Sequence, residues 1–380
     1  MWFNRGNLII LLPIEFLILG ESRDDRNYVG KFLNFKTEIM RSNSYLKSLV
    51  ILAVSSALLF SCNDDDTPEL ESSATLYTSN NANGNVTTYD ITNMSNITSK
   101  TFLTTSTMAD GVYYDASADI IVQASRSGLL LEGFTGIDGL LTGTALTRDI
   151  SSTADMQSPR ETAVRGNFYV VADNADADGN DATLDGRLFV YERNGTSFTL
   201  RNTITTDFKL WGITFIGTDL YAVVDADNEL AVFNNFLDNT ADATLSASKR
   251  IVVEGIVRTH GLTYDASSDI MVMTDIGEAS NTQDDGGFHM INNFSSKFAA
   301  TSNNGTLAVS DQVRVAGAAT LLGNPVDVAY DAASSTVFIA EAGNGGGRIL
   351  AFNNIGTGGN LTPAVNNSLV GASSVFLSAQ

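Results

Sequence analysis

The chain has 380 residues, a net charge of −21 at neutral pH and a single cysteine. One cysteine excludes a disulfide framework, and so acidic a chain repels nucleic acid, which we do not expect as a partner. The sequence contains no G-x-S-x-G nucleophile elbow, no H-E-x-x-H zinc motif and no phosphate-binding loop, which excludes several common catalytic classes.

Residues 1–39 do not read as part of a mature domain. They contain an apolar run, Leu8–Leu19, which is short for a membrane span and is interrupted by Pro13 and Glu15. Met40 lies where a signal peptide would begin. We therefore interpret 1–39 as an over-extended gene start, with an N-terminal membrane helix as the alternative.

Residues 40–61 are predicted to be a secretory signal peptide. Arg41 and Lys47 provide its positive start, and Leu49–Phe60 is an apolar core too short for a comfortable membrane span. The sequence ending in Cys62 (Leu-Phe-Ser-Cys) resembles the lipobox of bacterial lipoproteins. This resemblance implies that Cys62 carries lipid, including palmitate, and anchors the mature protein in the outer membrane. A stray or buried thiol is the alternative.

Residues 62–73 are predicted to be an acidic tether without packing signals. The run Asn63–Glu69 (NDDDTPE) resembles the acidic segment behind the cysteine in surface lipoproteins of the Bacteroidetes. That resemblance favours display on the cell surface over a periplasm-facing position. An ordinary solvated linker is the alternative.

From residue 74 the sequence repeats with a period of about 50 residues, which indicates an array of supersecondary units. The clearest copy, Gly261–Gly277, has echoes at 111–126 and 327–345 and looser copies at 162–174 and 212–225. Each copy has two short apolar runs around a polar turn, which predicts a β-hairpin.

Further strands are predicted after these hairpins. Third strands are expected at Leu129–Phe134, Arg187–Glu192, Glu229–Asn234, Phe288–Asn293 and Arg348–Asn353. Fourth, more variable strands are expected at Leu200–Thr205, Lys249–Glu254 and Gln312–Ala316. Four strands in each repeat of about 50 residues predict the blades of an all-β propeller. A β-sandwich and an open solenoid are the alternatives.

The two ends of the repeat region complement each other. Residues 74–90 resemble strands two and three of a repeat without a first strand, and Ser373–Leu377 resembles a first strand alone. If the C-terminal strand joins the N-terminal blade, residues 74–380 form a closed, six-bladed β-propeller of four-stranded blades. We expect this domain to be a monomer.

An acidic loop at 173–185 is the first candidate site. Placing Asn174 at position 1 of a calcium loop puts Asp176 and Asp178 at positions 3 and 5, and Asp185 at position 12. Alternating oxygens around a turn can wrap a hard cation. The predicted calcium ligands are Asn174, Asp176, Asp178, Asn180 and Asp185. A solvated acidic turn is the alternative.

The mouth of the central channel is the second candidate site. Alignment of the repeats places Asp110, Arg160, Trp211 and His260 at one level of the innermost strands, with Glu161 and Asp327 one step further. The predicted ligand-binding residues are Asp110, Arg160, Trp211, His260, Asn324 and Asp327. His260, Glu161 and Asp110 are the catalytic candidates, because a carboxylate could orient the imidazole for acid–base chemistry. Ordinary turn residues that never meet are the alternative.

The repeat over 74–380 resembles the NHL, YVTN and SMP-30/lactonase-like group of β-propellers. Lactonases of this type hold calcium at the channel mouth with Glu, Asn and Asp side chains. The resemblance implies Glu161, Asn324, Asp327 and Asp110 as the counterparts in this chain.

Two functions follow from the sequence. The favoured one is a lipid-anchored, extracytoplasmic binding module for a protein, glycan or small ligand. The alternative is a calcium-dependent, lactonase-like hydrolase with its site at the channel mouth.

Overall fold

The computed structural model describes residues 73–180 and 182–379. The predictions for residues 1–39, for the signal peptide at 40–61, for Cys62 and for nearly all of the tether lie outside the described residues. In the described ranges, no helix has the length and apolarity needed to cross a membrane.

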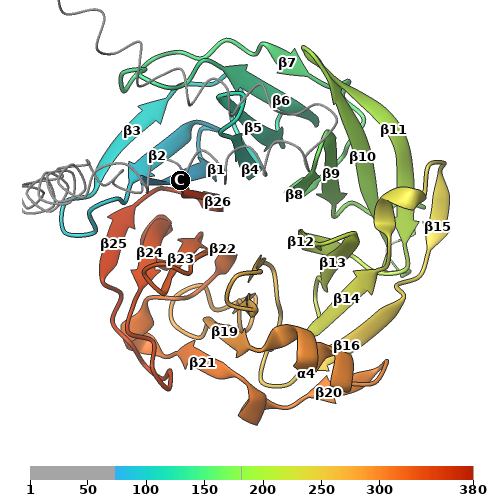
Figure 1. Ribbon diagram of the computed structural model, residues 1–380, viewed down its shortest axis with the longest axis vertical. Coiled ribbons are helices and arrows are strands. Elements are labelled where there is room, and N and C mark those ends of the chain that lie inside the picture. The colour runs from blue at the N-terminus through green and yellow to red at the C-terminus, as the bar shows by residue number, and fades with distance from the viewer. Residues whose placement is uncertain (1–72, 181, 380) are drawn as a thin grey trace, which may run out of the picture. The chain divides into compact units, whose positions relative to one another are not determined.

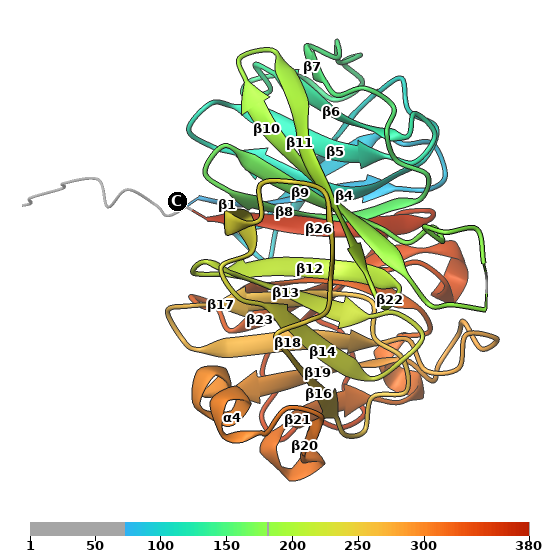
Figure 2. The same ribbon diagram turned by 90° about the vertical axis from the view of Figure 1, so that its right-hand side faces the viewer.

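Strands form almost all of the regular structure (Figure 1, and from the side in Figure 2). The first sheet contains β26 (Ala372–Ala379), β1 (Ala74–Asn80), β2 (Val86–Asp90) and β3 (Thr98–Phe102). The second contains β4 (Ala109–Asp115), β5 (Ile120–Ser125), β6 (Leu130–Thr135), β7 (Ile150–Ser151), β11 (Ser197–Thr206), β10 (Gly186–Asn194), β9 (Phe168–Asp173) and β8 (Pro159–Arg165), with β15 (Ala243–Leu245) on β11.

Three smaller sheets follow along the chain. The third contains β12 (Leu210–Ile216), β13 (Asp219–Val224), β14 (Glu229–Phe233), β16 (Lys249–Val253) and β20 (Gly305–Leu307). The fourth contains β17 (Leu262–Asp265), β18 (Ile270–Asp275), β19 (Gly287–Asn292) and β21 (Val313–Ala316). The fifth contains β22 (Pro325–Asp331), β23 (Thr336–Glu341), β24 (Arg348–Phe352) and β25 (Val365–Ser368).

Helical structure is sparse in the described part of the chain. It comprises α4 (Phe294–Ala300) and the 3₁₀ turns η1 (Phe236–Asp238), η2 (Val309–Asp311), η3 (Ala318–Thr320) and η4 (Asn344–Gly346).

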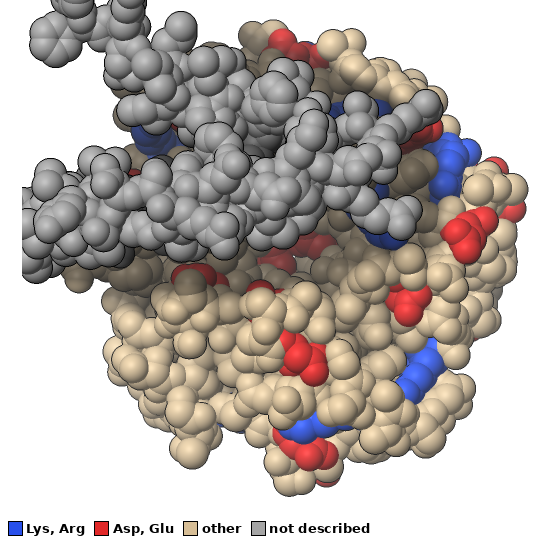
Figure 3. Space-filling model, in the orientation of Figure 1, with Lys and Arg blue, Asp and Glu red and all other residues tan. Residues whose placement is uncertain are grey.

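The strands of residues 74–379 are arranged around a central axis, with the first strand of each predicted hairpin innermost (Figure 1). The innermost strands contact one another in the cyclic order β26, β4, β8, β12, β17 and β22. Apolar side chains alternate between the two faces of each sheet, so both faces pack against neighbouring sheets and are buried. This all-β, propeller-like arrangement is the one that the repeat predicts. The face seen in Figure 3 carries scattered charges on a mostly uncharged surface.

Strand β26 pairs antiparallel with β1, from Ala74 opposite Ala379 to Asn80 opposite Ala372. The first sheet therefore contains strands from both ends of the described residues. Leu76 on β1 is 1% exposed and belongs to a cluster that includes Val375 on β26. The pairing buries apolar residues from both ends in one core.

The outer strands depart from the prediction in two places. The two-residue strand β7 makes only a single parallel pair with β11, Ser197 opposite Ser151. This pair links two runs of four strands, which together with β15 on β11 make one nine-stranded sheet. Helix α4 and β20 lie between β19 and β21 and were not predicted. They account for the longer spacing between the last two repeats, because an insertion at the rim leaves the inner hairpins in place.

Candidate binding site in the central channel

Close approach of the inner strands creates the candidate site. Strands β4, β8, β12 and β22 each shift register near their first residues, as at a β-bulge. Three of the positions at this level are glycines, Gly111, Gly212 and Gly261. A Cβ on Gly212 would lie 2.5 Å from the His260 carbonyl oxygen, and one on Gly261 would lie 2.6 Å from the Cα of Asp327. The absence of side chains lets neighbouring inner strands meet.

Buried carboxylates at the ends of the second strands hold the loops that lead into the inner strands. Asp173 accepts hydrogen bonds from the backbone N–H groups of Gln157 and Ser158, at 2.6 and 3.0 Å. Asp275 and Glu341 each accept such bonds from the loop of their own sheet. Because a buried carboxylate is stable only when it is hydrogen-bonded, these loops are fixed in position.

Five side chains form a continuous row, which we call the mouth belt: Asp110, Arg160, Trp211, His260 and Asp225. The first three lie on the inner strands β4, β8 and β12, whereas His260 precedes β17 and Asp225 directly follows β13. The Arg160 guanidinium donates to Asp110 Oδ2 at 3.4 Å and lies 4.3 Å from the Trp211 ring centroid. On the other side of Trp211, the His260 ring stacks at 3.8 Å with an interplanar angle of 5°. His260 Nε2 lies 3.2 Å from Asp225 Oδ1. Trp211 is therefore sandwiched between two cationic or polar groups.

Groups around the mouth belt hold its two carboxylates. Asn81 donates to Asp110 Oδ1 at 2.8 Å, and the Arg126 guanidinium lies 3.6 Å from Asp110 Oδ2. Arg258 donates to Asp225 Oδ1 at 2.6 Å, and Asn174 donates to Asp225 Oδ2 at 2.8 Å. Each carboxylate is thus fixed by several donors from different strands and loops.

Burial sets the protonation of the mouth belt. His260 is 4% exposed, and this burial holds its pKa below the ordinary value of histidine, so the ring is neutral at pH 7. Burial would raise the pKa of Asp225, but the His260 hydrogen bond and the Arg258 charge hold it well below its usual range. Burial raises the pKa of Asp110 against the opposing charge of Arg160.

Two buried nitrogen atoms of the mouth belt have no hydrogen-bond partner, Arg160 Nε and His260 Nδ1. A buried polar atom without a partner costs about 1–3 kcal/mol, so these positions favour a ligand that completes the missing bonds.

A second cluster lies one step further into the channel, where Glu161 and Asp327 form a carboxyl pair. Ser374 on β26 bridges them, with its hydroxyl 2.8 Å from Asp327 Oδ2 and 3.4 Å from Glu161 Oε2. Burial and repulsion from Asp327 raise the pKa of Glu161 well above its ordinary value, and burial raises the pKa of Asp327 to about 6. Near neutral pH the two groups compete for protons as a pair.

The acidic loop between β9 and β10 brings part of its predicted ligand set together. Carboxylate oxygens of Asp176, Asp178 and Asp185 lie within 4.8 Å of one another. Asn174, in contrast, donates to Leu210 and to Asp225 and so lies at the mouth belt. The exposed Asn180 accepts a bond from the backbone of the loop itself.

The sequence thus placed Asp110, Arg160, Trp211 and His260 correctly beside one another. The carboxylate that orients His260 is Asp225, not Asp110 or Glu161, and sequence reasoning missed it. A signal was present, because the second strands share an acidic end after a run of apolar and small residues: VVAD, AVVD, VMTD and FIAE. Asn324 lies apart, held through its backbone N–H by Glu341.

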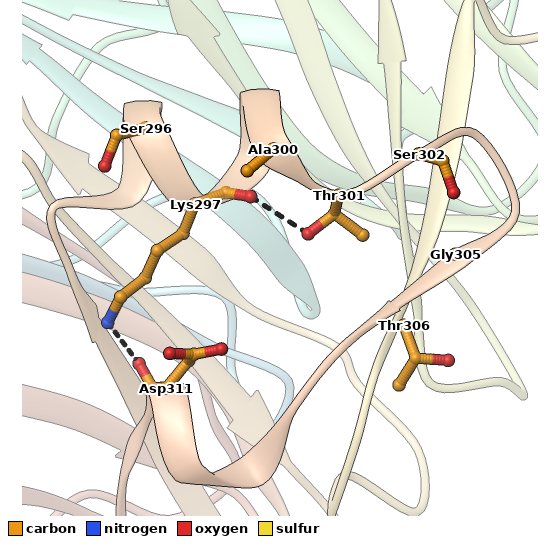
Figure 4. Close-up of a pocket in the computed structure, with 8 residues that line it drawn as sticks. All are labelled: Ser296, Lys297, Ala300, Thr301, Ser302, Gly305, Thr306 and Asp311. Carbon is orange, nitrogen blue, oxygen red and sulfur yellow. Dashed lines mark hydrogen bonds between the residues drawn. The ribbon is translucent and has the colours of Figure 1, made fainter.

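A hollow of about 660 Å³ lies at the rim, beside α4 and β20 (Figure 4). The lining residue Lys297 donates a hydrogen bond from its ammonium group to the carbonyl oxygen of Asp311. The Thr301 hydroxyl donates to the carbonyl oxygen of Lys297. These polar groups are therefore engaged within the protein.

No protein-family model and no curated protein sequence matches the chain. Solved structures match it in fold. A chain of a nidogen–laminin complex is 13% identical with a TM-score of 0.52, covering 80% of this chain and 98% of that one. A Bacteroides fragilis protein, described as a candidate 6-phosphogluconolactonase, is 11% identical with a TM-score of 0.51, covering 83% and 100%. A Bacteroides caccae protein of unknown function is 9% identical with a TM-score of 0.50, covering 80% and 98%.

The likeness to these solved structures shows that this chain has an all-β, propeller-like fold. At such identities the likeness is one of fold alone, because one fold hosts many unrelated functions. The function has to be argued from the channel.

Proposed function

We propose that the chain is a binding module whose ligand contacts the mouth belt. The observation that carries this proposal is the pair of buried, unpartnered nitrogens, Arg160 Nε and His260 Nδ1. Both faces of Trp211 are covered, so the indole positions its neighbours and does not stack on a ligand. The ligand is therefore polar and rich in oxygen, such as a hydroxy acid or sugar acid that accepts hydrogen bonds from a guanidinium.

The wider setting belongs to the same proposal. The described sheets count as six blades when the nine-stranded sheet is divided at the single β7–β11 pair, and β26 then closes the ring on β1. The mature protein is a monomer anchored through lipid on Cys62 in the outer membrane, facing the cell surface or the periplasm. The lipobox resemblance at 59–62 supports this anchor.

The mouth belt is tested by thermal unfolding with gluconate as an acidic probe and glucose as a neutral one. Gluconate is expected to raise the melting temperature of the parent and of Arg165→Gln, a control at the other end of β8. Arg160→Gln is expected to abolish this rise. An equal rise in Arg160→Gln would overturn the proposal, as would a parent that responds to neither probe.

The alternative function is a calcium-dependent, lactonase-like hydrolase, and the Glu161–Asp327 carboxyl pair beside Ser374 is the observation in its favour. The residues present fit calcium better at the acidic loop. In the described ranges, the only convergent group of three or more acidic, His or Cys side chains is Asp176, Asp178 and Asp185, where Asp176 Oδ2 is also unpartnered. Calcium needs six to eight oxygen ligands, which backbone carbonyls and water would complete.

Calorimetric titration with calcium separates these possibilities. If calcium binds at the loop, the double variant Asp176→Asn/Asp178→Asn loses binding and the exposed control Asp284→Asn retains it. If binding survives in the double variant, the channel is the metal site, and hydrolysis of glucono-δ-lactone by the parent and by Glu161→Gln is the next assay. A parent that binds no calcium would exclude both metal sites.

A further inference from the structure

The central channel itself contains a cavity of about 450 Å³. It begins at the Glu161–Asp327 carboxyl pair and extends along all six inner strands toward their C-terminal ends, away from the mouth belt. At that volume it can enclose a small organic molecule. Neither the mouth belt nor the acidic loop contributes to its lining.

The electrostatics of this cavity are one-sided. Its described lining includes three carboxylates, Glu161, Asp265 and Asp327, and no Lys, Arg or His. In the described part of the chain, the ion pairs also leave out both Glu161 and Asp327. A buried carboxylate is stable only when it is paired, hydrogen-bonded or protonated, and here the protein supplies hydrogen bonds but no cation.

Aromatic rings complete the lining. Five of them are partly exposed, one each on β4, β12, β17, β22 and β26: Tyr113, Phe215, Tyr264, Tyr330 and Phe376. The faces of aromatic rings attract cations, with gains of about 0.5–2 kcal/mol for a well-placed pair. Inner strands are also sheet edges, so each has backbone carbonyl groups that face the channel without a partner strand.

The Glu161–Asp327 carboxyl pair at one end, aromatic rings along the wall and no Lys, Arg or His in the described lining define one class of ligand. We propose that the channel binds a small organic ammonium ion, with its charged nitrogen at Glu161 and Asp327 and its apolar part between the aromatic rings. The nitrogen donates hydrogen bonds to the two carboxylates. The raised pKa values of both carboxyls agree with a site that lacks its counter-charge in the free protein.

This site is independent of the proposed function at the mouth belt, because the two share no residue. Its ligand also has the opposite charge. Failure of one proposal therefore leaves the other standing.

The test compares three probes of nearly equal shape by isothermal titration calorimetry on the purified protein: 2-phenylethylammonium, neutral 2-phenylethanol and anionic phenylacetate. We expect the ammonium ion to bind at least tenfold more tightly than the alcohol, and phenylacetate not to bind. Glu161→Gln and Asp327→Asn are each expected to lower the affinity for the ammonium ion at least tenfold. The exposed control Glu278→Gln is expected to leave its affinity unchanged.

Glu161→Gln keeps an oxygen that can accept the backbone N–H of Thr162, now 2.8 Å from Glu161 Oε1, so the variant is expected to fold. Circular dichroism and the gluconate response of the mouth belt check this. Equal affinity for all three probes would overturn the proposal, as would an unchanged affinity in a folded Glu161→Gln. Displacement of the ammonium ion by calcium at equal concentration would overturn it as well, by assigning the carboxyl pair to a metal.

Discussion

At the scale of single residues, the buried carboxylates of the channel depend on the donors that surround them. Asp225 accepts from Arg258, His260 and Asn174, and it is 4% exposed. Arg258 and His260 come from the loop before β17 and Asn174 from the loop after β9, so one carboxylate ties neighbouring sheets together. Removing its charge leaves several buried donors without their acceptor.

We expect Asp225→Asn to lower the free energy of unfolding by about 3 kcal/mol, the usual cost of breaking a buried charge network. The measurement is urea unfolding followed by circular dichroism. Asp227→Asn is the matched control, because Asp227 is exposed and its carboxylate caps only the adjacent backbone. A loss of the same size in both variants would show that the network adds nothing.

The carboxyl pair predicts a dependence of stability on pH. The pKa of Asp327 is raised from 3.8 to about 6, and that of Glu161 is raised as well. Across that range these two groups bind more protons in the folded protein than in the unfolded chain, so their contribution to the free energy of unfolding falls as pH rises from about 4 to about 6. Urea unfolding at several pH values measures this slope. The slope of the free energy of unfolding against pH is expected to be shallower in Glu161→Gln than in Glu278→Gln. Identical slopes in the two variants would contradict the coupling of Glu161 with Asp327.

At the scale of elements, the hairpins were predictable and their connections were not. Alternating apolar residues around Asp or Gly turns specify the inner hairpins locally, so the observed β17 and β18 match the repeat at 261–277. Helix α4 interrupts the period, and its N-cap Asn293 adopts a left-handed conformation, as Asn235 and Asn354 do at the ends of β14 and β24 without a following α-helix. The pairing of β7 with β11 joins distant segments, and no local pattern contains that information.

The close approach of the inner strands at a glycine gives a prediction at this scale. Gly261→Ala would place a Cβ 2.6 Å from the Cα of Asp327, so the two inner strands must separate. We expect a loss of about 1–3 kcal/mol in the free energy of unfolding, typical of overpacking. Thermal and urea unfolding measure it. Thr263→Ala, two residues further along the chain in β17, removes atoms at a partly exposed position and is expected to cost less.

At the scale of the whole molecule, the sequence predicted which residues meet at the mouth because the repeat carries each of them to the same level of an inner strand. It could not show Asp225 as the partner of His260, because the two belong to adjacent sheets and their contact depends on how the sheets pack. Nor did it reveal the cavity, whose walls come from six strands spread over the whole repeat region.

Deletion of 372–380 removes β26 and is expected to abolish cooperative unfolding. Without this strand, Leu76 and its neighbours in the cluster of β1 and β22 lose their cover, and Asp327 loses its bonds from Ser374 and Val375. Circular dichroism melting is the measurement, with deletion of 378–380 as the control. A cooperative melt at the parent temperature would show that β26 is dispensable.

The position of β26 also determines the stage of synthesis at which the channel can be completed. Ribosomes make β1 first and β26 last, yet the two pair side by side, and Ser374 on β26 completes the hydrogen bonds of Asp327. The channel therefore cannot take its final form before β26 has been made. Until the last strand has been released, β1 presents an open edge that other strands can pair with. A product cut short before β26 therefore has no finished channel and keeps this edge of β1 open.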